Sequence, residues 1–464
     1  SNLSNKMFSA IKEHIPPYFA DVSEIARWSL SQYRSNIFGD LDSIASSNSL
    51  TIRLPATPRN NLVFGFANVP YSSGFERRWH DATYIRNGLP IIVGKVVLLS
   101  ASGKEYEVSL VWGAFRWLQP VLESGNTLRS LPLGQELNLR QFNQNIFAHA
   151  KGILYGYLWY NNGGAKYAFP VVQVGWIFGI ILVRELQGVV DTSGVDLTKL
   201  NDYYINFNED LVDELVTDVR PEPAFPIKDY IPDIEIVDFV KSVCYLMGWY
   251  FEVSPATGLR LLDFSALQNS TALDWSDKLS SGSAPDSMSF DYNGYAQRNF
   301  MRYAEDDSVN INADGYVEVA DVTLDPEKTL FTMPFAPTYG SLIQQYVVIE
   351  EEDGSSTVEF VKTKPRILKA VDGIALDENG DEIPGLVFDS DMYFERIIRD
   401  RYSEFQDAVR KPIVVTVKLR LNDIDLLNLD FSRKIYLRQY GSYFGVMEIQ
   451  NDGDLSTAKL LKLQ

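Results

Sequence analysis

Side-chain oxygens recur at alternate positions in one short segment of the chain, a spacing that is typical of calcium-binding loops. Asn310, Asn312 and Asp314 stand at positions one, three and five of such a loop. Gly315 stands where the loop turns sharply, and Asp321 occupies the twelfth position. Carboxylate and amide oxygens are the ligands that Ca²⁺ prefers, so these four polar side chains are the candidate metal ligands. Because the first and last positions depart from the pattern, a plain turn is the preferred interpretation, and no metal or cofactor is predicted.

Two other acidic segments have simple structural interpretations. Asp377–Asp381 reads D-E-N-G-D, and Glu350–Asp353 is a run of four acids before Gly354. Asn, Asp and Gly favour turns through side-chain-to-backbone hydrogen bonds and positive φ angles. The first segment is therefore expected to be a turn rather than a cation site, and the second a solvated hairpin tip. The alternative for the second is a docking tip for a basic partner.

The remaining reactive residue types do not form a recognisable catalytic pattern. His14, His80 and His149 are far apart, and Cys244 is the single cysteine. Cys244 falls on or beside the apolar face of an expected helix, where it is most simply a small core residue. The sequence contains no GxxxxGK[ST], GxGxxG or GxSxG motif. The chain has 61 acidic residues, so two carboxylates at the separation needed for glycoside hydrolysis are expected by chance. The sequence alone therefore cannot test for such a pair. We therefore expect a protein that is not an enzyme.

The elements that must position these side chains are mostly strands. Leu50, Ile52 and Leu54 alternate with polar residues, as in a half-buried strand. Asn87-Gly88 predicts a type I′ hairpin turn, because both central positions of that turn need positive φ. Further strands are expected at 91–100, 105–112, 249–253, 259–262, 413–421, 434–440, 443–450 and 458–463. The predicted fold class is α+β and β-rich.

Two apolar segments predict helices that start at a proline and stop at a glycine. They run from Pro170 to Gly188 and from Pro232 to Gly248. In the second, five apolar residues fall on one face at helical spacing: Ile236, Phe239, Val240, Val243 and Met247. The most apolar run, Ala168–Val183, is shorter than the roughly 20 residues of a membrane span. No membrane-spanning segment is expected.

Length and composition predict several globular domains in an acidic chain. The 464 residues suggest about three domains, with two to four possible. Lys and Arg number 42 and Asp and Glu 61, giving a net charge of −19. Such a chain repels a phosphate backbone and anionic membranes. The expected organisation is a helical or irregular lead-in at 1–45, a β domain at 46–165, an α/β insert at 166–225, a helix-plus-strand segment at 226–285, and a second β domain at 286–464 with one helix near 391–409.

Short motifs along most of the chain resemble those of tail proteins encoded by phages and prophages of gut bacteria. Those proteins are baseplate-hub or tail-tip components. The motifs are S-L-T-I-R-L-P-A-T-P-R-N-N-L-V-F-G at 49–65, the Asn87-Gly88 turn, Gly94, Y-E-V-S-L-V-W-G at 106–113, A-L-D-W-S-D-K at 272–278, Y-A-Q-R-N at 295–299 with Tyr303, and Y-L-R-Q-Y-G-S-Y-F at 436–444. From the residue types, we expect Pro55 and Pro58 to stop a strand, and Asn60 and Asn61 to bond to backbone in a turn.

The resemblance implies a structural protein of the virion tail that is made in the bacterial cytoplasm. It implies a hub of two related antiparallel β domains, barrel-like or sandwich-like, with smaller α/β inserts. Three copies would form a ring that continues the tail tube, in contact with tube and tip proteins. DNA would pass through the ring without specific binding, which an acidic wall favours. Five aromatic residues are candidates for interface or core: Trp112, Trp117, Tyr436, Tyr440 and Tyr443.

Two other functions remain open at this point. A glycan-binding β-rich surface or tail protein would present a shallow aromatic cleft on a monomer. A cell-wall glycoside hydrolase would hold two carboxylates about 5 to 9.5 Å apart in a deep groove. The few histidines, the missing nucleophile motif and a hairpin-rich domain at each end favour assembly over catalysis.

Overall fold

The computed structural model describes most of the chain after the lead-in. The described residues are 19–22, 31–34, 48–72, 75–133, 136–138, 155–162, 165–206, 224–226, 228, 231–254, 258–280, 284–292, 294–305, 311–337, 345–350, 356–361, 364–376, 382–452 and 455–463. The segment at 351–355 that was expected to form a hairpin tip, the expected turn at 377–381 and Asn310 lie outside these residues.

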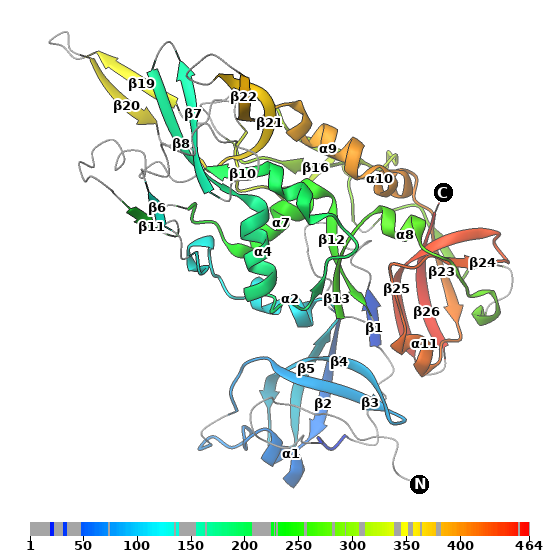
Figure 1. Cartoon of the computed structure of the whole chain (residues 1–464). Coiled ribbons are helices and arrows are strands. Elements are labelled where there is room, and N and C mark those ends of the chain that lie inside the picture. Colours follow the sequence, from blue (N-terminus) through cyan, green and yellow to red (C-terminus); the bar gives the residue numbers. More distant parts are fainter. Residues whose placement is uncertain are drawn as a thin grey trace.

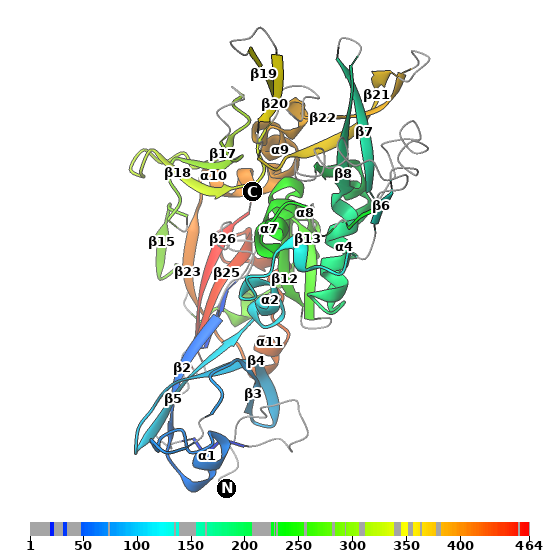
Figure 2. The same ribbon diagram turned by 90° about the vertical axis from the view of Figure 1, so that its left-hand side faces the viewer.

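The fold is α+β and β-rich, as predicted, and its strands form several separate sheets (Figures 1 and 2). Most of the described strand pairs are antiparallel, and none of the described sheets closes into a barrel. The buried apolar side chains form three clusters. One lies in the N-terminal sheet, one in a central body of sheets and helices, and one in the C-terminal sheet.

The N-terminal sheet contains four antiparallel strands in the order β2-β5-β4-β3. Their bounds are Asn48–Pro55 (β2), His80–Arg86 (β3), Leu89–Ala101 (β4) and Glu105–Trp112 (β5). Asn87 and Gly88 have φ angles of 52° and 81°, so the predicted hairpin turn between β3 and β4 is confirmed. Gly94 in β4 faces the carbonyl oxygen of Val111, which would lie 2.1 Å from a Cβ at that position. Only glycine fits this close approach of β4 and β5.

The central body packs helices against short strands. Its helical elements are α2 Phe115–Leu122, η1 Leu128–Ser130, α4 Val174–Arg184, η2 Leu197–Asp202, α7 Ile236–Met247 and α8 Ser265–Asn269. Helix α7 ends at Gly248, whose φ of 68° is left-handed, and its predicted apolar face is buried. Both predicted helices begin later than expected: α7 starts at Ile236 and not at Pro232, and α4 also ends at Arg184, before Gly188. Pro170 lies in a strand opposite Tyr157, and α4 starts only at Val174.

A five-stranded sheet, β22-β21-β10-β8-β7, joins distant parts of the chain. Its strands are β7 Tyr155–Asn162, β8 Ala165–Gln173, β10 Tyr203–Asn206, β21 Ile367–Leu376 and β22 Glu382–Val387. It therefore combines strands from both sides of the boundaries expected at 226 and 286. Two two-stranded sheets lie near it, β6 Glu136–Asn138 with β11 Ala224–Pro226, and the hairpin β19 Gln345–Glu350 with β20 Ser356–Val361. The β19–β20 hairpin projects from the body (Figure 2).

Two three-stranded sheets complete the central body. One contains β9 Val190–Asp191, β12 Trp249–Ser254 and β13 Gly258–Asp263. The other contains β16 Arg298–Arg302, β17 Gly315–Glu318 and β18 Glu327–Thr332, with β16 in the middle. Beside the second lie η4 Ser390–Met392, α9 Phe394–Arg401 and α10 Ser403–Arg410. The single helix predicted near 391–409 is thus two α-helices that meet at Tyr402, preceded by a short 3-10 turn.

The C-terminal sheet has seven strands and includes the lead-in. Its strands are β1 Ser31–Arg34, β14 Leu273–Asp274, β15 Ser287–Ser289, β23 Val414–Leu419, β24 Ile435–Leu437, β25 Ser442–Asp452 and β26 Leu455–Lys462. Turn η3 Ser276–Lys278 and helix α11 Asp423–Leu427 flank it. Strand β1 pairs antiparallel with β25. The lead-in, expected to be helical or irregular, therefore contributes a strand to the sheet at the opposite end of the chain.

No helix among the described residues combines the length and the apolar character needed to cross a membrane.

Candidate functional site

The motif around Thr57 and Asn60 is a buried joint that anchors the lead-in. Thr57 caps helix α1, Pro58–Val63, and its hydroxyl oxygen accepts a hydrogen bond from the backbone N–H of Asn60. The Asn60 side chain is fully buried and donates to the carbonyl oxygens of Asp21, at 2.8 Å, and Pro55, at 2.7 Å. Its Oδ1 accepts from the Asp21 backbone N–H at 2.7 Å. The predicted side-chain-to-backbone bonding is confirmed for Asn60, and its partner is a segment 39 residues away. Asn61 differs from the prediction, because its Oδ1 accepts hydrogen bonds from the Asn68 side chain and the Tyr106 hydroxyl.

The other motif residues lie at similar joints. Trp275 is buried in the C-terminal cluster. Asn299 is fully buried and donates to the carbonyl oxygens of Ala296, at 2.7 Å, and Val317, at 3.1 Å. The Tyr303 hydroxyl donates to a backbone carbonyl before helix α9 at 2.6 Å. Each of these side chains holds one chain segment to another.

The tryptophan candidates for an interface lie in or against cores. Trp112 is buried in the N-terminal cluster. Trp117 packs against the central cluster, and the Arg116 guanidinium stands over its ring at 4.4 Å. Gly258 approaches the same ring closely, since a Cβ there would lie 3.0 Å from it. These two residues thus contribute mainly to packing within the chain.

The tyrosine candidates lie on one hairpin of the C-terminal sheet. Tyr436 and Tyr443 are cross-strand partners in β24 and β25, with ring centroids 5.2 Å apart. Tyr443 is 48% exposed, and the Lys434 ammonium lies 5.4 Å from its ring centroid. Tyr440 packs edge-on against Phe444, and burial raises the pKa of its hydroxyl. Tyr443 and Tyr436 therefore form an aromatic pair at the surface, where a partner could contact them.

A second exposed apolar surface lies at the far end of the N-terminal domain. It consists of Leu62 in helix α1 and of three exposed side chains that follow the helix, Phe66, Val69 and Tyr71. Tyr71 is 96% exposed, and Phe66 has a positive φ of 55°. Clusters of exposed apolar side chains often mark contact surfaces.

The described candidate metal ligands, Asn312, Asp314 and Asp321, make contacts within the protein. Asp314 forms an ion pair with Arg302 at 2.8 Å, and its backbone N–H donates to Asn312. Asp321 accepts from the hydroxyl and the backbone N–H of Thr323, and these bonds lower the pKa of its carboxyl. Within the described ranges, no group of three or more His, Cys, Asp or Glu side chains is placed to hold a metal ion.

Gly315 has a different role from the one expected of a calcium-loop glycine. It begins strand β17, and a Cβ at this position would lie 2.3 Å from the backbone nitrogen of Glu395. The glycine therefore lets strand β17 pass directly beneath the start of helix α9. The close approach of strand and helix, and not a sharp turn, explains why this position holds a glycine.

Asp314 nevertheless lies in the wall of a cleft of ≈480 Å³. The cleft is bounded by strands β16 and β17 and by helices α9 and α10. Its walls are formed by Phe300, Arg302, Asn312, Asp314, Gly315, Tyr316, Glu318, Glu395, Gln406 and Arg410. Most of the lining residues are polar or charged, and Phe300 and Tyr316 add an aromatic side.

Acidic residues of the loop around helix α11 join three parts of the molecule. Asp423 forms an ion pair with Arg86, at the end of the N-terminal strand β3, and accepts from the Asn87 side chain at 3.2 Å. Asp425 binds the Lys278 ammonium at 2.7 Å. The side chains in both ion pairs are largely shielded from solvent. Helix α11 beside the C-terminal sheet is thus attached to the N-terminal hairpin by charge.

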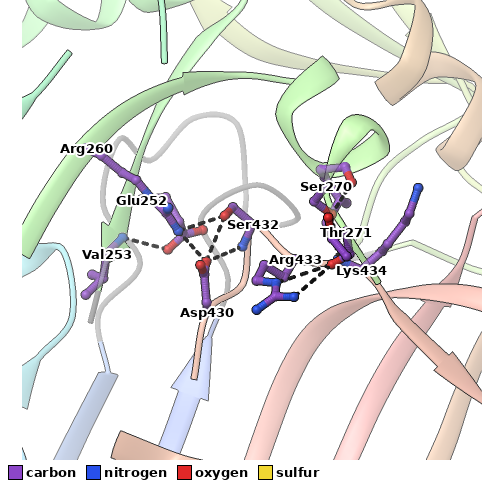
Figure 3. Close-up of polar contacts among 10 residues, drawn as sticks. Glu252, Val253, Arg260, Ser270, Thr271, Asp430, Ser432, Arg433 and Lys434 are labelled. Carbon is purple, nitrogen blue, oxygen red and sulfur yellow. Dashed lines mark hydrogen bonds and ion pairs between the residues drawn. The ribbon is translucent and has the colours of Figure 1, made fainter. Parts of the chain in front are cut away.

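Figure 3 shows the third of these contacts, where Asp430 meets the central body. Arg260 of strand β13 forms an ion pair with Asp430 and donates to the Ser432 hydroxyl at 2.7 Å. The Ser432 hydroxyl in turn donates to Asp430 at 2.8 Å. Nearby Glu252, only 1% exposed, accepts from the backbone N–H of Val253. The loop is therefore held by a small polar network rather than by a single ion pair.

No sequence motif pointed to these junctions. The paired residues are 337, 147 and 170 positions apart, so no local spacing relates them. Arg433 and Lys434 add bonds from the same loop to the segment at 270–271. The repeated aspartates at 423, 425 and 430 were the only available signal.

The cysteine and the described histidine are in structural positions. Cys244 is buried in helix α7, and burial raises the pKa of its thiol to about 12. His80 is buried, packs against Phe75 and lies 3.0 Å from the carbonyl oxygen of Glu76. The other two histidines lie outside the described residues.

Three solved structures are similar to this chain over nearly its whole length. The 43 kDa tail protein of prophage MuSo2 from Shewanella oneidensis is 8% identical, with a TM-score of 0.41, over 99% of this chain and 98% of that chain. The tail protein from Neisseria meningitidis MC58 is 10% identical, with a TM-score of 0.39, over 98% and 96%. Prophage tail protein gp18 from Listeria monocytogenes EGD-e is 6% identical, with a TM-score of 0.36, over 98% and 94%.

No family model matches the chain, and no curated protein matches its sequence. The three similar structures are all tail proteins, the class that the sequence motifs resemble.

Proposed function

We propose that this chain is a non-enzymatic structural component of a bacteriophage or prophage tail, in the baseplate hub or tail tip. The observation that carries the proposal is the position of the residues that resemble tail proteins. They are spread from the first β domain to the last hairpin, and Asn60, Trp275 and Asn299 each hold segments together. A catalytic motif would instead bring reactive side chains to one cleft. The motif residues thus suit a protein that works through its shape.

The protein would act by assembling with copies of itself and with neighbouring tail proteins. The β19–β20 hairpin pairs with no other described strand, and an isolated hairpin is only marginally stable in water. Packing against an adjacent subunit would stabilise it. The aromatic pair Tyr436–Tyr443 and the exposed apolar side chains in and after helix α1 offer further contact surfaces. Three copies in a ring would continue the tail tube.

The net charge suits a wall along which DNA passes without specific binding. The chain carries −19, so its average surface repels a polyanion. DNA could then move through a ring of three copies without being retained. The virion tail would be the site of action, after synthesis in the bacterial cytoplasm.

A deletion experiment tests the tail function directly. The gene is removed from a lysogen that carries it, the phage is induced, and particles are counted by electron microscopy. We expect tailless or incomplete particles, and normal tails when the intact gene is supplied in trans. Immunogold labelling of complete particles should mark the tail end. Normal tails without the gene would rule out the proposed role.

Light scattering coupled to size exclusion tests the assembly. A mass three times that of one chain supports a ring, and an Ala substitution at Tyr443 should lower the trimer fraction. The enzymatic alternative is tested separately by incubating the purified chain with cell-wall material. Release of reducing sugars would identify a hydrolase and would contradict the non-enzymatic proposal.

A further inference from the structure

We infer that the cleft between strands β16–β17 and helices α9–α10 binds a neutral oligosaccharide. The inference does not depend on the proposed tail function, because it uses only the walls of this cleft. Its volume of ≈480 Å³ lies within the roughly 300–1,000 Å³ that is usual for ligand sites. Such a volume has room for a short oligosaccharide.

The charges in the walls favour a neutral ligand. Arg302 is paired with Asp314 at 2.8 Å, and Arg410 is paired with Glu318 at 3.2 Å. Glu395 adds a third acid, so two positive charges face three negative ones. A phosphate or carboxylate ligand would meet acids beside each arginine. A metal cation would meet guanidinium groups beside the acids. The cleft therefore offers neither anions nor cations a wall of uniformly opposite charge.

Hydroxyl groups fit this pattern of paired charges. Each hydroxyl donates one hydrogen bond and accepts others, so it can bind a carboxylate and a guanidinium at the same time. The Arg302–Asp314 pair presents donor and acceptor side by side, and Asn312 adds an amide with both functions. A ring that carries several hydroxyls would therefore satisfy both members of each pair.

The aromatic side of the cleft suits the apolar face of a sugar ring. Phe300 and Tyr316 are neighbours across strands β16 and β17, with ring centroids 5.2 Å apart. Tyr316 is 44% exposed, whereas the Arg302 guanidinium stands over the Phe300 ring at 4.3 Å. Tyr316 thus offers an apolar ring with a polar tip, to which the C–H groups of a pyranose can pack.

The opposite wall is held rigid, which reduces the entropic cost of binding. The Gln406 side chain in helix α10 donates to the carbonyl oxygen of Glu318 at 2.8 Å and accepts from its backbone N–H at 2.9 Å. Helix α10 is thereby fixed to strand β17. Gly315 brings helix α9 against the same strand. The cleft is therefore formed before any ligand arrives.

Two trisaccharides distinguish the possible sources of such a ligand. Chitotriose carries the N-acetylglucosamine units of cell-wall glycan strands, and maltotriose represents neutral hexose polymers of cell surfaces. Binding of each to the full chain is measured by saturation-transfer NMR and isothermal titration calorimetry. We expect at least one to bind. The one with the lower Kd identifies the source, and equal affinities would support the general class.

Substitutions then locate the site. Y316A should raise the Kd about tenfold, because a stacking contact is lost. D314N should raise it by a similar factor, because Arg302 loses its counter-charge. Y71A, which removes a 96% exposed ring in the N-terminal domain, is the matched control and should leave the Kd unchanged.

Circular dichroism and thermal unfolding establish that each variant is folded. If D314N fails to fold, Y316A alone decides, since its side chain lies at the surface. The inference is overturned if neither trisaccharide binds to the folded wild-type chain. It is also overturned if Y316A binds as tightly as wild type, or if inorganic phosphate binds more tightly than both sugars.

Discussion

Replacing Asn60 by alanine should release the lead-in from the N-terminal domain. The Asn60 side chain makes three hydrogen bonds, two to the backbone of Asp21 and one to the carbonyl oxygen of Pro55. Each such bond contributes about 1 kcal/mol net, and a buried partner left without one costs about 1–3 kcal/mol. With Asp21 partly exposed, water can replace some of these bonds. We expect a loss of about 3 kcal/mol.

The neighbouring Arg59 provides a matched control. It also contacts Asp21, through an ion pair of 3.1 Å, but 54% of its side chain is exposed. Surface ion pairs contribute about 0–1 kcal/mol. R59A should therefore have a small effect, although it removes a larger side chain and a charge. The comparison separates a buried amide from an exposed charge at the same site.

Native-state hydrogen exchange is the suitable assay, because a chain with three separate cores need not unfold in a single step. The Asp21 amide donates directly to Asn60. A loss of about 3 kcal/mol corresponds to exchange roughly a hundredfold faster for this amide in N60A. R59A should accelerate it less than about fivefold. Equal, small accelerations in both variants would show that the buried amide does not anchor the lead-in.

Three further predictions concern other parts of the fold. G94A should destabilise the N-terminal sheet by more than about 2 kcal/mol, measured by native-state hydrogen exchange of its strand amides, because its Cβ would meet a backbone carbonyl. G103A, with open space around its Cβ, should be neutral in the same assay. Native Cys244 should react with Ellman's reagent at pH 8 roughly a thousandfold more slowly than after denaturation, because its thiol pKa is raised from 9.0 to about 12; rapid native labelling would contradict the buried position. The pKa values of Asp274 and Asp321 are lowered because each carboxylate accepts hydrogen bonds from a hydroxyl and a backbone N–H two residues later. These carboxylates therefore stabilise the folded state above the ordinary pKa of 3.8, and this stabilisation is lost as the pH falls through the lower folded pKa values. The urea midpoint should therefore decline below about pH 4, and less steeply in the D274N/D321N double variant; an unchanged slope would contradict this assignment.

Local sequence signals predicted the elements whose geometry is set by neighbouring residues. The Asn87-Gly88 turn needs two positive φ angles, and Gly248 ends α7 in a left-handed conformation, so residue type alone indicates both. The start of α4 could not be found in this way. The run after Pro170 is apolar on every side, and periodicity cannot separate a buried strand from a buried helix.

Tertiary contacts determine the bounds of the elements that the sequence did not predict. Tyr402 separates α9 from α10, and its hydroxyl donates to the carbonyl oxygen of Tyr245 in a helix far away in sequence. Strand β1 has only four residues, Ser31–Arg34, and forms because β25 offers an edge. Of the candidate site residues, the spacing around Asp314 marked a polar cleft, although the calcium pattern that drew attention to it has another physical origin.

The lead-in is a short tether between the N-terminal sheet and the C-terminal sheet. Asp21 is fastened to the N-terminal domain through Asn60, and Ser31 begins the strand in the C-terminal sheet. The chain between Asp21 and Ser31 reaches at most about 35 Å when fully extended, so the two domains cannot drift further apart while both anchors hold. Within that radius, the N-terminal hairpin stays at high effective concentration near Asp423. The contacts of Asp423 with Arg86 and Asn87 then form between groups that are already held close together. Cutting the chain between Asp21 and Ser31 should weaken these contacts, although β5 still continues into α2 and every core remains intact.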